Sequence, residues 1–327
     1  MSSSSSNIIK SASISFDGSC SFLLPCYFPS ISSIKTNLSP VEYLRVLVAL
    51  QHPHFLISAY DIFHSDEPTQ LEIRQLIEKA NSKGAAILLD SGNYESYWRR
   101  DSNWTFDNFI SVLKSVESIP VFSFDIQNTD ADSLEIAKQI QAQAVVEQSS
   151  NHEVIPIIHA NGTDIEEIAS EIVQLMSSKM VAIPERLLGD GIIQRVKTVA
   201  RIRKRLNQCD RYIPIHLLGT GNPLSILLYV MCGADSFDGL EWCQTTVDHS
   251  TALLYHFQQR ELFDMQNEFC EMADLPYSQV TLAHNLLFYR DWMGKIRDSL
   301  SDGNLLEKAI EYYSGDFMSK VDVYLDL

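Results

Sequence analysis

The sequence predicts an α/β fold: a (β/α)8 barrel followed by a short helical C-terminal extension. Short apolar, β-prone segments alternate with segments of helical periodicity through the middle of the chain. Asp90, Asp125 and His159 end three successive predicted strands at intervals of 35 and 34 residues, the size of one strand–helix unit. Seven such units, with a further strand expected near the N-terminus, favour the closed barrel. A doubly wound open sheet is the competing architecture, although no G-x-G-x-x-G turn follows a strand.

The strands are predicted where apolar runs end in polar residues or glycine, at 55–60, 85–90, 121–125, 154–159, 180–184, 213–219 and 236–238. Helices are predicted between them at 71–83, 105–116, 163–172, 192–206 and 223–232. Thr105 is placed to cap one of these helices, and Thr163 with Glu166 forms a capping box for another. After Asp238 the alternation stops, and helices are expected at 246–263, 280–300 and 305–313. We therefore expect a Ser-rich leader at 1–10, one barrel domain at 11–300, and a C-terminal helix with an acidic tail at 301–327.

The composition excludes several classes of protein. Hydrophobic residues make up 45% of the 327 residues, enough to bury a core, so the chain as a whole is not intrinsically disordered. No apolar run approaches the ~20 residues of a membrane span, and the initial serine run lacks the basic and apolar regions of a secretory signal. The six cysteines form no C-x-x-C pair, so we expect a reducing, cytoplasmic compartment. The net charge of −17, from 25 basic and 42 acidic residues, argues against a generic basic coat for nucleic acid.

Three carboxylates end predicted strands at the carboxyl rim, where barrel active sites form: Asp90, Asp125 and Asp238. A single aspartate at such a position is often only a turn former or a helix cap. Three at one rim favour a site that needs several carboxylates, because burying a charge is costly unless it is paired or used. Glycosyl transfer is one such chemistry, with a carboxylate nucleophile and a second acid/base group.

Other polar residues follow neighbouring strands. His159 and Asn161 follow the fourth predicted strand, and His159 is as consistent with a structural role as with a functional one. Glu185 and Arg186 follow the fifth, where they could simply pair with each other. The glycine-rich loop 219–221 opens directly into a helix, so it is suited either to binding a phosphate or to letting a flat ligand approach the backbone.

Five short segments lie in order over about residues 85–300: DSGNYE at 90–95, FD at 124–125, GTGNP at 219–223, GADSFD at 233–238 and AHNLLFY at 283–289. Together they resemble the tRNA-guanine transglycosylase superfamily of (β/α)8 barrels, which includes the queuine and archaeosine tRNA-ribosyltransferases. The first segment is similar to that family's DSGG[YF]Q, and the second to its FD strand end. The third and fourth are similar to GVGTP and to GVDMFD, which holds the nucleophile. The last is similar to the family's IHNLxxY helix.

The resemblance implies a pentosyltransferase that replaces guanine in a polynucleotide with a 7-deazaguanine and needs no cofactor. It implies that Asp238 attacks C1′ of a guanosine nucleotide to give a covalent glycosyl-enzyme, and that Asp90 takes the proton from N9 of the incoming base. The implied base pocket comprises Asp125 on the Watson–Crick edge, Tyr94 and Leu218 on the two faces, the Gly219 backbone, Ser91, and an amide position that falls on Asn161 or His159, of which we favour Asn161.

Two departures from the family pattern affect the expected substrate. The family's zinc site needs a C-x-C-x-x-C cluster before the histidine of the last motif, but only Cys270 lies shortly before His284. One cysteine and one histidine cannot build a four-ligand site, so we predict that the zinc subdomain is reduced or lost and that no metal is bound. The residues 184–186 also replace the Gly-Gly-Leu that bacterial members place against the base. These changes make the chain more similar to the divergent branch that inserts 7-deazaguanines into DNA than to a tRNA enzyme.

The expected partners are a nucleic acid and a 7-deazaguanine base, with a protein partner or a second copy to assist and no membrane. Basic residues that could contact phosphates cluster at Arg195, Lys197, Arg201, Arg203, Lys204, Arg205 and Arg211, and at Arg290, Lys295 and Arg297. The alternative for the first cluster is a solvated helix face on the outside of the barrel. Two other functions compete with catalysis of base exchange: a non-catalytic subunit that keeps the fold, and an unrelated barrel enzyme acting on a small phosphorylated or glycosidic substrate.

Overall fold

The computed structural model describes residues 12–16, 20–124, 133–148, 151–159, 164–271 and 274–323. Its central element is an eight-stranded parallel sheet in the order β7-β6-β5-β4-β3-β10-β9-β8. The strands are β3 (Cys26–Ile31), β4 (His54–Ser58), β5 (Ala86–Asp90), β6 (Val121–Phe122), β7 (Val154–Ile155), β8 (Val181–Pro184), β9 (Ile215–Leu218) and β10 (Ser236–Gly239). A parallel bridge between Ile157 and Ala182 joins the segment after β7 to β8 and closes the sheet. The predicted α/β barrel is therefore confirmed.

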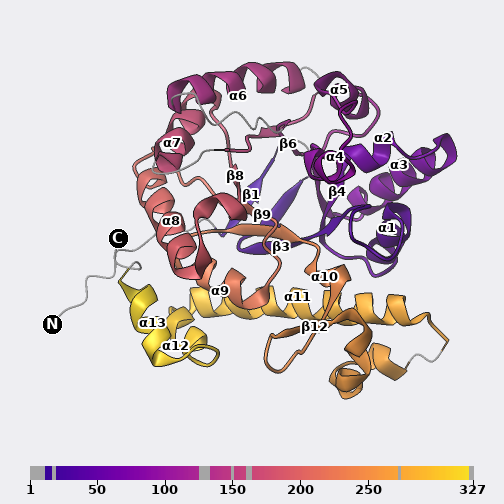
Figure 1. Cartoon of the computed structure of the whole chain (residues 1–327), viewed down its shortest axis with the longest axis vertical. Coiled ribbons are helices and arrows are strands. Elements are labelled where there is room, and N and C mark those ends of the chain that lie inside the picture. The colour runs from indigo at the N-terminus through magenta and orange to yellow at the C-terminus, as the bar shows by residue number, and fades with distance from the viewer. Residues whose placement is uncertain are drawn as a thin grey trace.

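Helices surround the barrel as a ring (Figure 1). They are α1 (Pro40–Ala49), α2 (Ala59–Phe63), α3 (Glu67–Asn81), α4 (Asn93–Arg99), α5 (Phe106–Leu113), α6 (Ser133–Gln148), α7 (Ile165–Met176), α8 (Gly191–Leu206), α9 (Pro223–Met231) and α11 (Tyr277–Ser301). The predicted cap of α5 is present, since the Thr105 side chain accepts a hydrogen bond from the Asn108 N–H. Thr163 lies outside the described residues. The expected helical C-terminal region is also present as α12 (Leu305–Ile310) and α13 (Gly315–Asp322). No described helix is long and apolar enough to cross a membrane.

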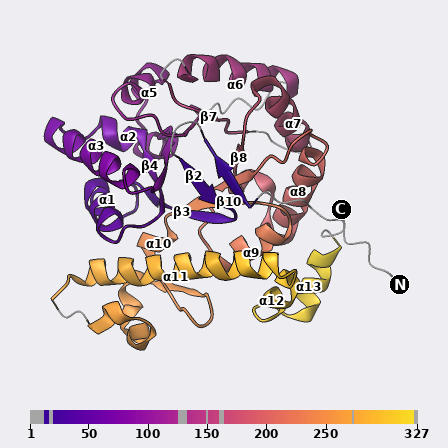
Figure 2. The same ribbon diagram turned by 180° about the vertical axis from the view of Figure 1, so that it is seen from behind.

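The barrel interior is a separate apolar cluster, closed at one end by the N-terminal hairpin of β1 (Ser13–Ser15) and β2 (Ser21–Leu23). Phe22 of the hairpin packs edge-on against Phe28 of β3, with 5.1 Å between ring centroids, and lies 6.1 Å from the ring of His54 at the start of β4. Figure 2 shows the hairpin in the middle of the ring. Because it packs on the amino ends of the strands, the carboxyl ends are the end at which a site can form.

The segment after β10 differs from the sequence prediction. The helix expected at 246–263 is wrong: α10 (Glu241–Gln244) is followed by an antiparallel hairpin of β11 (Thr245–Val247) and β12 (Leu254–His256), and then by the 3-10 turns η2 (Phe257–Gln266) and η3 (Glu268–Glu271). The Asp248 side chain holds the turn by accepting hydrogen bonds from Ser250 and Thr251. Asn285 of α11 then accepts from the Val247 N–H at 3.0 Å. Turn chemistry and this long-range contact override the helical spacing.

The arginines of α8 form ion pairs within the fold. Arg201 and Arg205 form ion pairs with Glu166 and Glu167 of α7, at 2.7 and 2.9 Å. The helix lies on the outer ring (Figure 1), so its face is not a phosphate-binding surface at the barrel rim. The ion pairs and the outer position of α8 favour the alternative of a helix face on the outside of the barrel for this cluster.

Arg203 and Asp235 form a buried ion pair that joins α8 to the amino ends of β9 and β10. Each side chain is 2% exposed, and Nη2 of Arg203 lies 2.8 Å from Oδ2 of Asp235. Arg203 also donates to the backbone carbonyls of Gly233 and Ile213, and Asp235 accepts from the Ile215 N–H. These hydrogen bonds offset the cost of burying the two charges, although Nη1 of Arg203 is buried without a hydrogen-bond partner among the described residues.

Replacing Arg203 with methionine should lower the free energy of unfolding by about 3–5 kcal/mol, because Asp235 would be left buried without its cation. Urea denaturation measures the loss. The matched control is Arg205→Met, which breaks an exposed pair with Glu167 and should cost only about 0–1 kcal/mol. Equal losses for the two variants would contradict a structural role for the buried pair.

Candidate active site

Asp238 is held by three hydrogen bonds at the carboxyl end of β10. Its Oδ2 accepts from the Ser30 hydroxyl of β3 at 2.6 Å, and its Oδ1 accepts from the Gly219 N–H at 3.0 Å. Nε2 of His216, on β9, lies 3.2 Å from the same Oδ1. The residue is only 7% exposed. The carboxylate is thus fixed in place by both neighbouring strands, and charge-assisted hydrogen bonds offset the cost of burying it.

His216 is itself oriented from behind. The ring is fully buried, and its Nδ1 lies 2.8 Å from the Ser236 hydroxyl. Because an ionised Asp238 carboxylate can only accept, the ring donates to it through Nε2. The Cys26 thiol contacts the same hydroxyl at 3.5 Å. These inward-facing side chains of β3, β9 and β10 place Asp238 in one orientation.

Asp90 lies on the same rim, at the end of β5, with β4 and β3 between its strand and β10. Its Oδ2 accepts from the Gly92 N–H at 3.0 Å. Gly92 has a φ of 84°, and a Cβ there would overlap the Tyr60 side chain. The tight turn therefore requires glycine and directs the chain from Asp90 straight into α4.

The first turn of α4 carries a carboxyl group that the sequence reasoning missed. Glu95 is buried and accepts from the hydroxyls of Ser32 and Ser58, at 2.5 and 2.9 Å. Burial, together with the negative charges of Asp61 and Asp90, raises the pKa of Glu95 to about 8. The raised pKa of Glu95 lowers the negative charge that it adds beside Asp90 near neutral pH.

Glu241 is a second missed carboxyl group, on the turn after β10. Burial raises its pKa to about 7, and the charge of Asp238 acts in the same direction. A Cβ at Gly221 or at Gly239 would collide with the Glu241 carboxyl group. The glycines of the 219–221 loop and of β10 are thus needed to let this side chain fit between the two backbone segments.

The remaining predicted residues are placed as follows. Leu218 and Gly219 lie at the end of β9, where the Gly219 N–H is donated to Asp238. Tyr94 is half-exposed on α4, and His159 is buried just beyond β7. Ser91 is buried, and its carbonyl accepts from the Trp104 indole at 3.1 Å.

Asp125 and Asn161 lie outside the described residues, so their predicted roles stay predictions. Glu185 differs from the expectation that it pairs with Arg186. Its carboxylate instead contacts the Arg195 guanidinium at 3.0 Å and the Tyr229 hydroxyl at 2.6 Å.

Two of the residues missed in the sequence analysis, His216 and Glu95, have recognisable signals. His216 is a polar residue inside an apolar strand, and Glu95 is the last position of the DSGNYE segment, where the similar family motif has glutamine. Ser30 has no such signal, because a serine at a strand end is ordinary and its contact with Asp238 spans 208 positions of the chain.

His284 does not fit a zinc site. Its Nε2 lies 2.7 Å from the Val247 carbonyl, and its Nδ1 is hydrogen-bonded to the Asn267 amide, so both ring nitrogens have protein partners. Among the described residues, no group of three or more His, Cys, Asp or Glu side chains is arranged to hold a metal ion. The Cys270 side chain is not among those described. His284 and Asn285 instead fasten the β11–β12 hairpin to α11.

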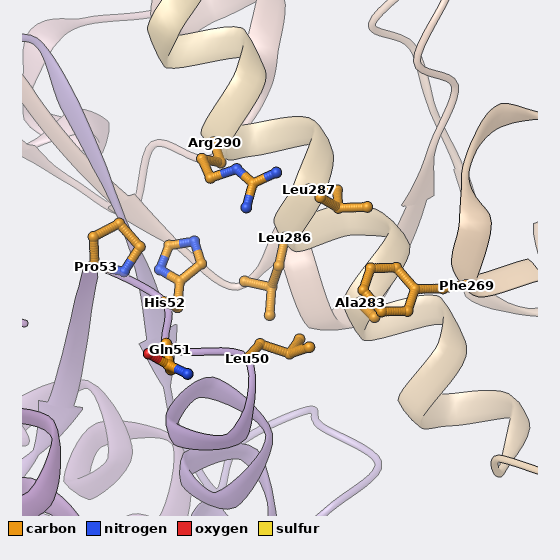
Figure 3. A pocket seen from close by; sticks show the side chains of 9 residues that line it. All are labelled: Leu50, Gln51, His52, Pro53, Phe269, Ala283, Leu286, Leu287 and Arg290. Atoms are coloured by element: carbon orange, nitrogen blue, oxygen red, sulfur yellow. The ribbon is translucent and has the colours of Figure 1, made fainter. Parts of the chain in front are cut away.

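A cavity of about 90 Å³ lies at the opposite end of the barrel, between residues 50–53 and α11 (Figure 3). Its walls combine apolar side chains with the polar side chains of Gln51, His52 and Arg290. Burial lowers the pKa of His52 to about 4, so the ring is neutral. Because residues 50–53 precede β4 rather than follow it, this cavity is separate from the rim that carries Asp238.

Comparison with known proteins agrees with the resemblance seen in the motifs. No protein-family model matches the chain. Among curated proteins, the chain is similar to the tRNA-guanine(15) transglycosylase of Sulfolobus acidocaldarius, with 23% identity over 309 residues. The match covers 86% of this chain and 60% of that protein, so the chain spans about three fifths of the length of the relative.

Replacing Glu95 with glutamine should flatten the pH dependence of stability. The raised pKa of about 8, against an ordinary value of 4.5, means that the folded protein binds a proton that the unfolded chain releases. The resulting stabilisation is fully present below about pH 4.5 and is lost as the pH rises through about 8. The loss amounts to a few kcal/mol, since one pKa unit corresponds to about 1.4 kcal/mol.

Urea unfolding at several pH values between 5 and 9 checks this expectation, using roughly unit steps. Glu95→Gln should be more stable than the unmodified protein at the alkaline end, while the exposed control Glu78→Gln should follow the unmodified curve. If the free energy of unfolding depended on pH in the same way for Glu95→Gln and the unmodified protein, Glu95 would be ionised over the whole pH range.

Proposed function

We propose that the protein is a base-exchanging transglycosylase, a pentosyltransferase that replaces guanine in a polynucleotide with a 7-deazaguanine. The observation that carries the proposal is the fixed carboxylate of Asp238, held by Ser30, His216 and Gly219 on the same rim as Asp90. The similarity to a tRNA-guanine transglycosylase supports the same reaction class. Both carboxylates are positioned before any substrate arrives, which favours catalysis over a purely binding role.

In the first half-reaction, an Asp238 oxygen attacks C1′ of the target nucleotide. The C1′–N9 bond breaks with its electron pair passing to guanine, and a covalent glycosyl ester forms on Asp238. The hydrogen bonds from Ser30, His216 and Gly219 orient the attacking carboxylate. Asp90 supplies a proton to the departing base at N9.

In the second half-reaction the roles reverse. Asp90, now ionised, takes the proton from N9 of the incoming base, and N9 attacks C1′ to release Asp238. The raised pKa of Glu95 limits the negative charge beside Asp90 near neutral pH. The same carboxyl group thus serves as acid in one direction and base in the other, as microscopic reversibility requires.

The base pocket is proposed from the residues that the motifs indicate. Tyr94 and Leu218 would enclose the base, and the Gly219 carbonyl is the backbone acceptor next to it, because the Gly219 N–H is donated to Asp238. The remaining contacts are assigned to Asp125, Ser91, and Asn161 or His159.

We propose DNA rather than tRNA as the polynucleotide. The support is that His284, the histidine of the family's zinc motif, here bonds through both ring nitrogens to the Val247 carbonyl and the Asn267 amide. The reaction is assigned to a reducing cytoplasm, which the free thiols of five described cysteines support. Since the chain carries a net charge of −17, a protein partner or a second copy is expected to assist the encounter with the polynucleotide.

Incubation with labelled guanine, and separately with labelled 7-deazaguanine, tests the proposal on single-stranded DNA, duplex DNA and tRNA. Label should enter DNA preferentially. Asp238→Asn should reduce labelling by at least about 1,000-fold, because the amide cannot form the glycosyl ester. Thermal unfolding and base binding serve as controls that the variant is folded.

Each other outcome has a definite meaning. Labelling of tRNA alone would overturn the choice of DNA but keep the reaction. Undiminished labelling by Asp238→Asn would remove Asp238 as nucleophile. Absence of labelling from every polynucleotide, with intact base binding, would favour the non-catalytic subunit.

A further inference from the structure

Three exposed aromatic side chains lie on one face of α4, next to the candidate active site. Tyr94, Tyr97 and Trp98 are 40%, 68% and 47% exposed. Their spacing of three and four residues puts them on the same face of the helix. Trp98 makes edge contacts with both tyrosines, at ring-centroid distances of 6.3 and 5.7 Å. Single exposed apolar residues are ordinary in proteins, but a contiguous group of this kind indicates a binding surface.

The packing of α4 on the barrel keeps the face with Tyr94, Tyr97 and Trp98 exposed to solvent. Glu95, on another face of α4, is buried against Ser32 and Ser58 and anchors the helix to β3 and β4. In Figure 1, α4 lies closer to the barrel centre than α3 does. Because α4 follows Asp90 after a single tight turn, its aromatic face begins at the rim of the site.

Cationic side chains accompany the aromatic face. Nζ of Lys35 lies 3.5 Å from the centre of the Trp98 ring, a cation–π contact. Arg99 is exposed and donates to the Ser33 hydroxyl at 3.0 Å. Arg100 ends α4 with a φ of 54°, and Lys35 has a φ of 55°. Both have the left-handed conformation that favours glycine, so the backbone does not explain why these residues are basic.

This combination is unusual on a chain with a net charge of −17. On α8, the arginines 195, 201, 203 and 205 form ion pairs within the fold. Beside α4, three basic residues instead border an exposed aromatic surface. Aromatic rings that stack bases, next to cations that contact phosphates, are the two components of a single-strand binding surface.

We propose that the face formed by Tyr97, Trp98, Lys35 and Arg100 binds the unpaired nucleotides that flank the target nucleotide. This inference rests on the proposed function, and it specifies how an acidic protein holds a polynucleotide. Asp238 is too deeply buried to reach C1′ of a stacked, paired nucleotide, so the target must leave the duplex. The neighbouring bases then lose a stacking partner, which the aromatic rings of α4 replace. The Lys35 ammonium group, which lies over the Trp98 ring, would contact the phosphates next to the stacked base.

The test measures binding of a fluorescein-labelled single-stranded DNA that contains one central guanine, with Asp238→Asn as the parent protein so that no turnover occurs. Adding Trp98→Ala should weaken binding about 10-fold, because one stacked base contributes about 1–3 kcal/mol. Trp98→Phe should restore the affinity, since phenylalanine still stacks. Tyr255→Ala, which removes an exposed aromatic side chain from the β11–β12 hairpin, should leave the affinity unchanged.

Tryptophan fluorescence gives a second, independent measurement. Of the four tryptophans, Trp98 is exposed, whereas Trp104, Trp242 and Trp292 are buried. Single-stranded DNA should therefore quench the emission, and the quenching should disappear in Trp98→Phe although binding persists. Unchanged affinity in Trp98→Ala, or quenching that survives in Trp98→Phe, would overturn the inference.

The two proposals fail separately. If the protein incorporates labelled base but Trp98→Ala has an unchanged KM for the polynucleotide, the base exchange stands and the α4 surface is wrong. If single-stranded DNA binds through Trp98 but no base is ever incorporated, the surface stands and the proposed reaction is wrong. A surface that binds no DNA and instead covers another protein would give no quenching with any oligonucleotide, which contradicts the inference.

Discussion

Hydrogen bonds to one buried carboxylate connect three neighbouring strands at the carboxyl rim of the barrel. Ser30 approaches Asp238 from β3, while His216 and Gly219 approach it from β9. Burying an ion without such partners costs several kcal/mol, so the strands that create the burial also supply the donors. The register of the sheet therefore determines the orientation of Asp238, because it places the donors of the neighbouring strands beside the carboxylate. The contact between Nδ1 of His216 and the Ser236 hydroxyl orients the ring that bonds to the same carboxylate.

Several acidic side chains lie at this rim, and the fold lowers the cost of their negative charges in different ways. Asp238 is stabilised by donors, whereas burial raises the pKa of Glu95 and of Glu241 enough to keep much of their charge off the site near neutral pH. The negative charge of the rim is thereby concentrated on fewer groups, among them the Asp238 carboxylate, which in the proposed reaction faces the positive charge that builds at the sugar carbon. The four arginines of α8 form ion pairs within the fold. The aromatic and basic face of α4 is the surface that we propose for contact with a polynucleotide.

The barrel was predictable because its signals are local. The strand–helix interval, the cap at Thr105 and the aspartates at strand ends can each be recognised within a few residues of sequence. The β11–β12 hairpin was not, because its stability depends on Asn285, which lies 38 positions away from Val247. Among the site residues, Asp90 and Asp238 follow from position and resemblance. The contacts of Ser30 and Glu95 require knowing which strands become neighbours.

The covalent intermediate is the central claim, and it can be observed directly. The protein is mixed with DNA in the absence of added base, quenched with acid, digested with nuclease and protease, and its peptides are analysed by mass spectrometry. The account predicts a deoxyribosyl adduct on the peptide that contains Asp238, with free guanine released in equal amount. An adduct on Asp90 or Glu95, or base exchange without any adduct, would contradict it.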